Sequence, residues 1–243
     1  MPHQLAFTAF LNRFLAGPVT ALLTALHLPP QYPQAPISNA VAMEFLVFLI
    51  LVLLFIVIRM RLSADNPGGL QHLLEATQGF VANQSREMIG HNYERYTPYL
   101  VVLGLFILFG NMLGLVPGME APTAVPIVPL GCALVTWFYY QYHGLRAHGP
   151  GYIKHFMGPV WWLAPLMLVI EIFSHLARIL SLTIRLYANM FAGDMVTLVF
   201  FSLIPLLAPV LFMGLHIGVA LIQTYIFVLL ATVYLAEATA HEH

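Results

Sequence analysis

The sequence predicts an all-α integral membrane protein, and three observations carry this prediction. Of the 243 residues, 60% are hydrophobic and only 8% are charged, whereas about 25% of a soluble protein is charged. Apolar runs long enough to cross a bilayer recur along the chain. Polar residues inside the last runs repeat at helical spacing. We expect a single membrane domain over residues 1–243, with five transmembrane helices and one amphipathic helix on the inner surface.

The sequence also indicates which ligands and partners are not expected. The single Cys132 cannot form an internal disulfide, and a formal net charge of −1 gives no reason to expect nucleic acid. The sequence contains no Walker A pattern, so nucleotide binding is not expected. His143, His148 and His155 lack the spacing of metal ligands. We therefore expect neither a metal nor another cofactor.

Residues 1–40 are predicted to form an outer-surface segment. The stretch 4–27 lacks the basic start of a signal peptide, and Asn12 and Arg13 interrupt its apolar core, so a short interfacial helix is expected. Four prolines within 28–36 exclude regular helix there. The first span, 41–60, ends at Arg59 and Arg61, which places that end on the inner side.

The middle of the chain is predicted to hold an interfacial helix and a hairpin. After a turn at 65–69, the apolar residues of 70–90 fall mostly on one helical face, which is typical of a helix lying on the membrane surface. Residues 99–142 form a two-span hairpin, with spans at 99–116 and 124–142. The loop 143–159 carries Arg146 and Lys154 and is expected to be cytoplasmic.

Residues 160–240 hold two apolar blocks, 161–204 and 206–240. As straight helices they would be about 60 and 50 Å long, against a hydrocarbon thickness of about 30 Å. The chain has no Gly or Pro between Pro165 and Gly193, so we favour one long tilted helix paired antiparallel with the next. Two shorter spans within the first block are the alternative.

The basic residues predict the topology. With the N-terminus outside and five crossings, the outer segments hold only Arg13, and the C-terminus is cytoplasmic. The inner segments would hold Arg59, Arg61, Arg86, Arg95, Arg146 and Lys154. Short basic inner loops fit the plasma (inner) membrane of a bacterium best.

Two arginines lie inside the most apolar third of the chain. Glu171, Arg178 and Arg185 are seven residues apart and share one helical face, which Asn189 extends by one turn. Asp194 is about half a turn out of phase with Arg185 and is expected to point away. A cation at bilayer depth costs roughly 3 kcal/mol or more, which favours a functional role.

Polar residues also share one face of the last predicted helix, because His216 and Gln223 are seven residues apart and Glu237 follows two heptads later. Glu171, Asp194 and His216 can exchange protons, whereas Arg185 stays charged at any attainable pH and is predicted to be a fixed counter-charge. It would attract a carboxylate about 4 Å away by roughly 4 kcal/mol, enough to remove a proton from a buried acid.

Each of these residues also has a structural interpretation. Arg178 could pair with Glu171 or donate to helix carbonyls, and Glu171 could be only its partner. His216 could be a hydrogen-bonded packing residue. The amides Asn111, Asn189 and Gln223 could join helices by hydrogen bonds, and for Asn111 this is the interpretation we favour.

The stretch SLTIRLYANMFAGD (181–194) resembles the signature of the a subunit of F-type ATP synthases, Ser-Leu-x-x-Arg-Leu-Phe-Gly-Asn-x-x-Ala-Gly-Glu. Three other stretches are similar to the same family in the same order: TPYLVVLGLFILFGNMLGLVPG, EIFSHLARILSL and LIQTYIFVLLATVYLAEA. The resemblance covers about residues 90–240. Asp194 replaces the family's Glu, Tyr187-Ala188 its Phe-Gly, and Ala177-Arg178 its Lys-Pro, which leaves the role of Arg178 open.

The resemblance implies the stator proton-channel subunit of the F0 sector, which is not catalytic alone. Two half-channels would load and unload the carboxylates of a c-ring, with Arg185 preventing a short circuit. By position, Asn189 and Gln223 match polar residues near the arginine, Asp194 and His216 the outer half-channel, and Glu171 an acid near the inner one. The implied partners are the c-ring, the subunit b peripheral stalk, the F1 sector indirectly, and the lipid bilayer.

Two other functions are compatible with the residues. A stand-alone proton-coupled transporter would use Arg185 to hold an anionic substrate. An intramembrane enzyme is disfavoured, because the sequence has no HExxH and no GxSxG motif.

Overall fold

The computed structural model describes residues 4–28, 30, 32–63, 68–116, 118–149, 161–203 and 207–240, and all regular structure within these ranges is helical. The predicted all-α class is thereby confirmed. Lys154, His155 and most of the turn predicted at 65–69 lie outside the described residues. The helices are α1 (Ala6–Ala25), α2 (Asn39–Met60), α3 (Gly69–Ile89), α4 (Thr97–Leu113), α5 (Ile127–His148), α7 (Ala164–Leu203) and α8 (Leu207–Thr239), with short 3-10 turns η1 (Tyr93–Arg95), η2 (Pro122–Ala124) and η3 (Trp161–Leu163).

Five of the described helical segments are long and apolar enough to cross a membrane. They are Ala6–Ala25, Asn39–Met60, Tyr93–Leu113, Ala164–Phe200 and Leu211–Thr239. The expected number is confirmed, but the set differs from the predicted one. By length and composition α1 qualifies, although we expected it to be interfacial, while α5 falls short because its second half is rich in Tyr, Gln and His.

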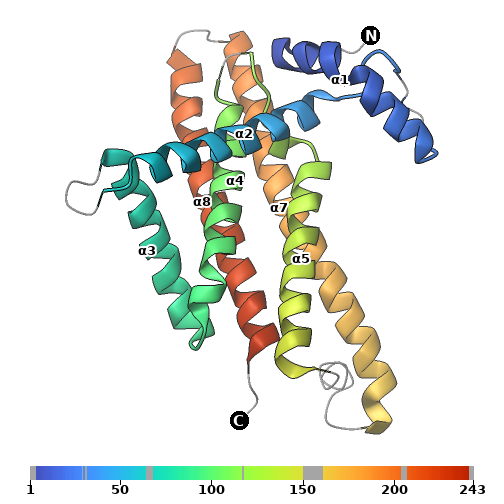
Figure 1. Ribbon diagram of the computed structural model, residues 1–243, viewed down its shortest axis with the longest axis vertical. Coiled ribbons are helices and arrows are strands. Elements are labelled where there is room, and N and C mark those ends of the chain that lie inside the picture. The colour runs from blue at the N-terminus through green and yellow to red at the C-terminus, as the bar shows by residue number, and fades with distance from the viewer. Residues whose placement is uncertain are drawn as a thin grey trace.

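Helices α4, α5, α7 and α8 run side by side and form the body of the protein (Figure 1). Their shared core holds fully buried apolar side chains from each helix, including Leu100, Ala133, Leu186 and Phe227. Gly104 allows α4 to approach α8 closely, since a Cβ at this position would lie 3.0 Å from Cγ2 of Val228. This core holds α7 and α8 in a fixed register.

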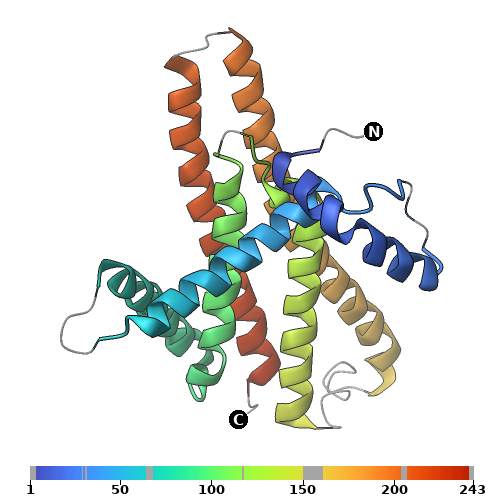
Figure 2. The same cartoon turned by 45° about the horizontal axis from the view of Figure 1, so that its top comes forward.

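The last two helices are long and antiparallel, as the sequence predicts (Figure 2). Helix α7 runs without a break through its 40 residues, which decides against two shorter spans. Even Gly193 lies within the helix, because a glycine weakens a helix without ending it. Helix α8 has 33 residues.

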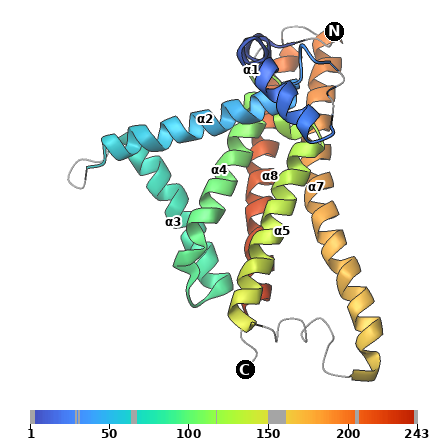
Figure 3. The ribbon, with the colours of Figure 1, turned by 45° about the vertical axis from the view of Figure 1, so that its right-hand side comes forward.

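Helix α2 crosses the bundle instead of joining it (Figure 3). Its 22 residues span about 33 Å, close to the thickness of a bilayer. One side packs on α4 through Met43 and Val47, and the rest exposes large apolar side chains such as Phe48 and Ile56, as a lipid-facing helix does. If α2 stands along the bilayer normal, the helices that it crosses are steeply tilted, which accommodates the length of α7.

Helices α1 and α3 lie at opposite ends of α2 (Figure 3). Asn12, which interrupts the apolar run of α1, is buried, and its side chain both donates to and accepts from the backbone of Ile37 at 3.1 Å. This polar residue therefore ties α1 to the proline-rich linker that precedes α2. At the other end, α3 returns along α4 and α8.

Candidate functional site

Polar side chains of α7 and α8 meet in cross-helix pairs along the interface between the two helices. Asn189 Nδ2 donates to Gln223 Oε1 at 2.7 Å, and Arg178 Nη2 lies 2.9 Å from Glu237 Oε1. Because the helices are antiparallel, residues with higher numbers on α7 pair with residues with lower numbers on α8. The predicted shared face of His216, Gln223 and Glu237 on α8 is thus the face that meets α7.

Arg185 lies between these pairs on α7. Its Nη2 donates to Ser181 Oγ one turn earlier at 3.2 Å, and the side chain is half-exposed. Among the described residues, no carboxylate forms an ion pair with this guanidinium. Four exposed positions near it on the same side of the helix are small: Ala177, Ser181, Ala188 and Ala192. The charge is therefore accessible to a group outside this chain.

Asp194 and His216 form the pair at one end of the interface. His216 Nδ1 lies 3.8 Å from Asp194 Oδ1, and His216 is only 5% exposed. Gly193 makes this approach possible, because a Cβ there would lie 2.9 Å from His216 Nδ1. Asp194 was expected to point away from the face of Arg185, yet both it and Asn189 meet α8. Two helices that cross at an angle present different faces along their length.

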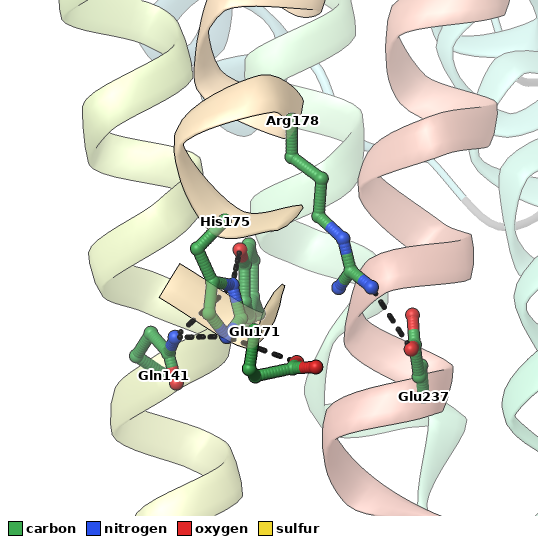
Figure 4. Close-up of polar contacts among 6 residues, drawn as sticks. Gln141, Glu171, His175, Arg178 and Glu237 are labelled. Carbon is green, nitrogen blue, oxygen red and sulfur yellow. Dashed lines mark hydrogen bonds and ion pairs between the residues drawn. The ribbon is translucent and has the colours of Figure 1, made fainter. Parts of the chain in front are cut away.

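The other end of the interface holds Glu171 and Arg178, and they do not pair with each other (Figure 4). Glu171 Oε1 lies 3.4 Å from Nε2 of His175, one turn later on α7. Arg178 pairs instead with Glu237 and lies over the ring of Tyr234, 5.0 Å from its centroid. The first of the alternatives left open by the sequence, an Arg178–Glu171 pair, is therefore wrong.

Three residues near Glu171 were missed from the sequence: His175, Tyr140 and Gln141. His175 is 8% exposed, and its Nδ1 lies 3.0 Å from the hydroxyl of Tyr140. Gln141 Nε2 is 3.3 Å from His175 Nε2. The spacing of four between Glu171 and His175 signals their contact on a helix, but nothing in the sequence places α5 against them.

Asn111 of α4 lies apart from these pairs. Its Nδ2 is 3.5 Å from both the carbonyl oxygen of Ala220 and Oγ1 of Thr224, on α8. These contacts agree with the favoured interpretation of Asn111 as a residue that joins helices.

Both ends of the α7–α8 interface hold side chains that can bind and release protons, whereas Arg185 in its middle cannot. Asp194 and His216 at one end, and Glu171 and His175 at the other, are proton-exchanging groups. Arg185 between them carries a permanent charge. In chemical terms, the arrangement is two proton-exchanging sites separated by a fixed cation on an accessible face.

The family model for the ATP synthase A chain matches residues 41–236. The chain is 70% identical to ATP synthase subunit a of Koribacter versatilis, over 100% of both chains. It is 50% identical to ATP synthase subunit a of Solibacter usitatus, over 96% of this chain and 99% of the relative. It is 37% identical to ATP synthase subunit a 1 of Pelobacter propionicus, over 100% of both. The chain, a multi-pass membrane protein, therefore belongs to the ATP synthase A chain family.

Proposed function

We propose that the chain is the stator proton-channel subunit of the F0 sector of an ATP synthase. Two aqueous half-channels, entering from opposite faces of the membrane, load and unload the carboxylates of a rotating c-ring. Arg185 separates the half-channels and prevents a short circuit. The names of the relatives and the order of the polar groups along α7 and α8 support this function.

The observation that carries the proposal is the exposure of Arg185 and its lack of an ion-pair partner among the described residues. Its guanidinium is half-exposed, donates within the chain to Ser181, and has no ion-paired carboxylate among the described residues. Small side chains beside it leave room for a partner helix to approach. A carboxylate arriving about 4 Å away would gain roughly 4 kcal/mol in its ionised form and would therefore release its proton.

The two ends of the interface supply the half-channels in this proposal. The Asp194–His216 pair lies nine residues after Arg185, about 14 Å along the helix. The Glu171–His175 pair begins fourteen residues before Arg185, about 21 Å away. We assign the first pair to the outer half-channel and the second to the inner one, with Asn189 and Gln223 beside the arginine.

The remaining assignments follow from this role. The chain forms a single membrane domain in the bacterial plasma membrane, with its N-terminus outside and its C-terminus in the cytoplasm. The opposite placement of α1 and α3 at the two ends of α2 supports an outer-surface and an inner-surface segment. Its partners are the c-ring, the subunit b stalk and, indirectly, the F1 sector, and the chain has no catalytic activity alone.

A stand-alone proton-coupled transporter is the second candidate, since an Arg185 without a carboxylate partner in the described chain also suits an anionic substrate. The two functions differ in a simple assay. Uptake of an anion by liposomes that contain only this chain would favour the transporter, whereas the proposed subunit requires a c-ring.

The proposal is tested by proton flux through the assembled complex in liposomes. Arg185→Ala is expected to abolish ATP-driven pumping while passive flux through the membrane sector persists or rises. Asp194→Ala is expected to lower passive flux. Arg13→Ala, at an exposed position of α1, serves as a matched control that removes an arginine outside the α7–α8 interface. Normal pumping by Arg185→Ala would overturn the proposal.

A further inference from the structure

A pocket of about 570 Å³ lies where α3, α5 and α8 end, far along the bundle from Asp194 and His216. Its volume is within the usual range for a small-molecule site. Of the ten described residues that line it, four are basic or can become so, and none is acidic. The four are His91, Arg95, His143 and Arg146. Such a lining favours the binding of an anion in the pocket.

The two arginines reach the pocket from different elements. Arg95 belongs to η1, and Arg146 to the last turn of α5. Both side chains are exposed, and in the described part of the chain neither is ion-paired with a carboxylate. Two permanent positive charges therefore share one cavity, and an anion between them would relieve their repulsion.

Aromatic rings cluster beside this pocket. His143, three residues before Arg146 on α5, is buried, with its ring 5.0 Å from that of Tyr96 and 4.5 Å from that of Tyr139. Tyr139 also stacks on Tyr99 at 3.8 Å. Clustered tyrosines are typical of the membrane–water interface, where lipid headgroups lie.

An apolar groove of about 440 Å³ lies on helices α3, α4 and α8 as well. Its lining includes Phe80, Val101, Leu105 and Tyr225. Thr239 in the basic pocket and Val228 in the groove are eleven residues apart on α8, or about 16 Å. An acyl chain can cover that distance. The basic pocket therefore suits the headgroup of a lipid, and the apolar groove suits its acyl chain.

We propose that the basic pocket binds the phosphate of an anionic phospholipid, with Arg95 and Arg146 as the phosphate ligands. Guanidinium groups bind phosphate oxygens in a bidentate manner, and basic pockets between membrane helices bind anionic headgroups. Inorganic phosphate shares this chemistry, but it has no acyl chain to occupy the apolar groove.

The test uses the complete complex in nanodiscs of equimolar phosphatidylglycerol and phosphatidylcholine, from which it is extracted in mild detergent. The lipid retained by the complex is then quantified by mass spectrometry. Wild type is expected to retain phosphatidylglycerol in preference to phosphatidylcholine. Loss of two arginine–phosphate attractions in the variant Arg95→Gln/Arg146→Gln is expected to weaken this preference by about 30-fold.

The matched control is Arg59→Gln/Arg61→Gln, which removes two charges at the end of α2 and is expected to keep the preference. If the double variant fails to assemble, the single variants are used instead. Each is expected to weaken the preference for phosphatidylglycerol by about 5-fold. Equal loss in the control, or no preference in wild type, would overturn the site. Displacement of phosphatidylglycerol by millimolar inorganic phosphate, with the same dependence on Arg95 and Arg146, would overturn its assignment to a lipid.

Discussion

Arg178 of α7 and Glu237 of α8 form an ion pair at 2.9 Å, although 59 residues separate them in the chain. The seven-residue spacing on α7 suggested Glu171 as a partner for Arg178, yet an intervening turn of helix allows Glu171 to reach His175 instead. The antiparallel register of α7 and α8 brings Glu237 opposite Arg178. This pair links the end of the last helix to the helix that carries Arg185.

We expect a double-mutant cycle on Arg178→Ala and Glu237→Ala to give a coupling free energy of about 0.5–1 kcal/mol. The value is modest because 55% of the Glu237 side chain is exposed, against 18% for Arg178. The measurement is chemical unfolding of the purified membrane sector. The same cycle with Arg178→Ala and Glu75→Ala, which do not pair, should give a coupling near zero, and equal values in both cycles would contradict the role of the ion pair.

Gly193→Ala is expected to displace the ring of His216 and lengthen its contact with Asp194. The added Cβ would lie 2.9 Å from Nδ1 and 3.0 Å from Cε1 of that ring, so the imidazole must move. Passive proton flux through the membrane sector should fall toward the level of Asp194→Ala without loss of the folded protein.

The control is Gly218→Ala on α8, where a Cβ has no neighbour within 4 Å. It gains the same helix propensity, about 1 kcal/mol, and should leave flux unchanged. Unaltered flux in Gly193→Ala would show that the close approach of His216 to α7 is not needed.

His175→Phe is expected to reduce proton flux more than His175→Gln. Phenylalanine removes both ring nitrogens, which face the Tyr140 hydroxyl and the Glu171 carboxylate, whereas glutamine keeps a donor and an acceptor. Loss of such a buried polar partner costs about 1–3 kcal/mol. The assay is ATP-driven pumping by the assembled complex, with exposed His72→Phe on α3 as the control. Equal activity of the two His175 variants would indicate that His175 only fills space.

Gly104→Leu is expected to destabilise the four-helix body by about 1–3 kcal/mol through overpacking. A Cβ on Gly104 already lies 3.0 Å from Val228 Cγ2, so a larger side chain must separate α4 from α8. Gly131→Leu on α5 introduces the same residue where a Cβ has no neighbour within 4 Å. Thermal unfolding in detergent should show a lower midpoint for Gly104→Leu than for Gly131→Leu, and identical midpoints would refute the close packing of α4 and α8.

The sequence by itself determined the class of the fold and the length of its last two helices. In a bilayer every backbone polar group must be satisfied within the segment, so long apolar runs leave few choices besides helices. The absence of Gly and Pro between Pro165 and Gly193 kept α7 unbroken. Heptad spacing also placed His216, Gln223 and Glu237 on one face of α8, and this face meets α7 in the structure.

Only the tertiary structure decided which partner each polar group meets. A helical period fixes the face of a residue but not the register or crossing of the helix opposite. The period alone therefore did not place Asp194 against His216, which only the resemblance had assigned together, and nothing in the sequence placed Arg178 against Glu237. The same limit applies to His175, whose partner Tyr140 comes from α5. Contacts between distant segments depend on how whole helices pack, and this information is spread over the entire core instead of residing in the local pattern.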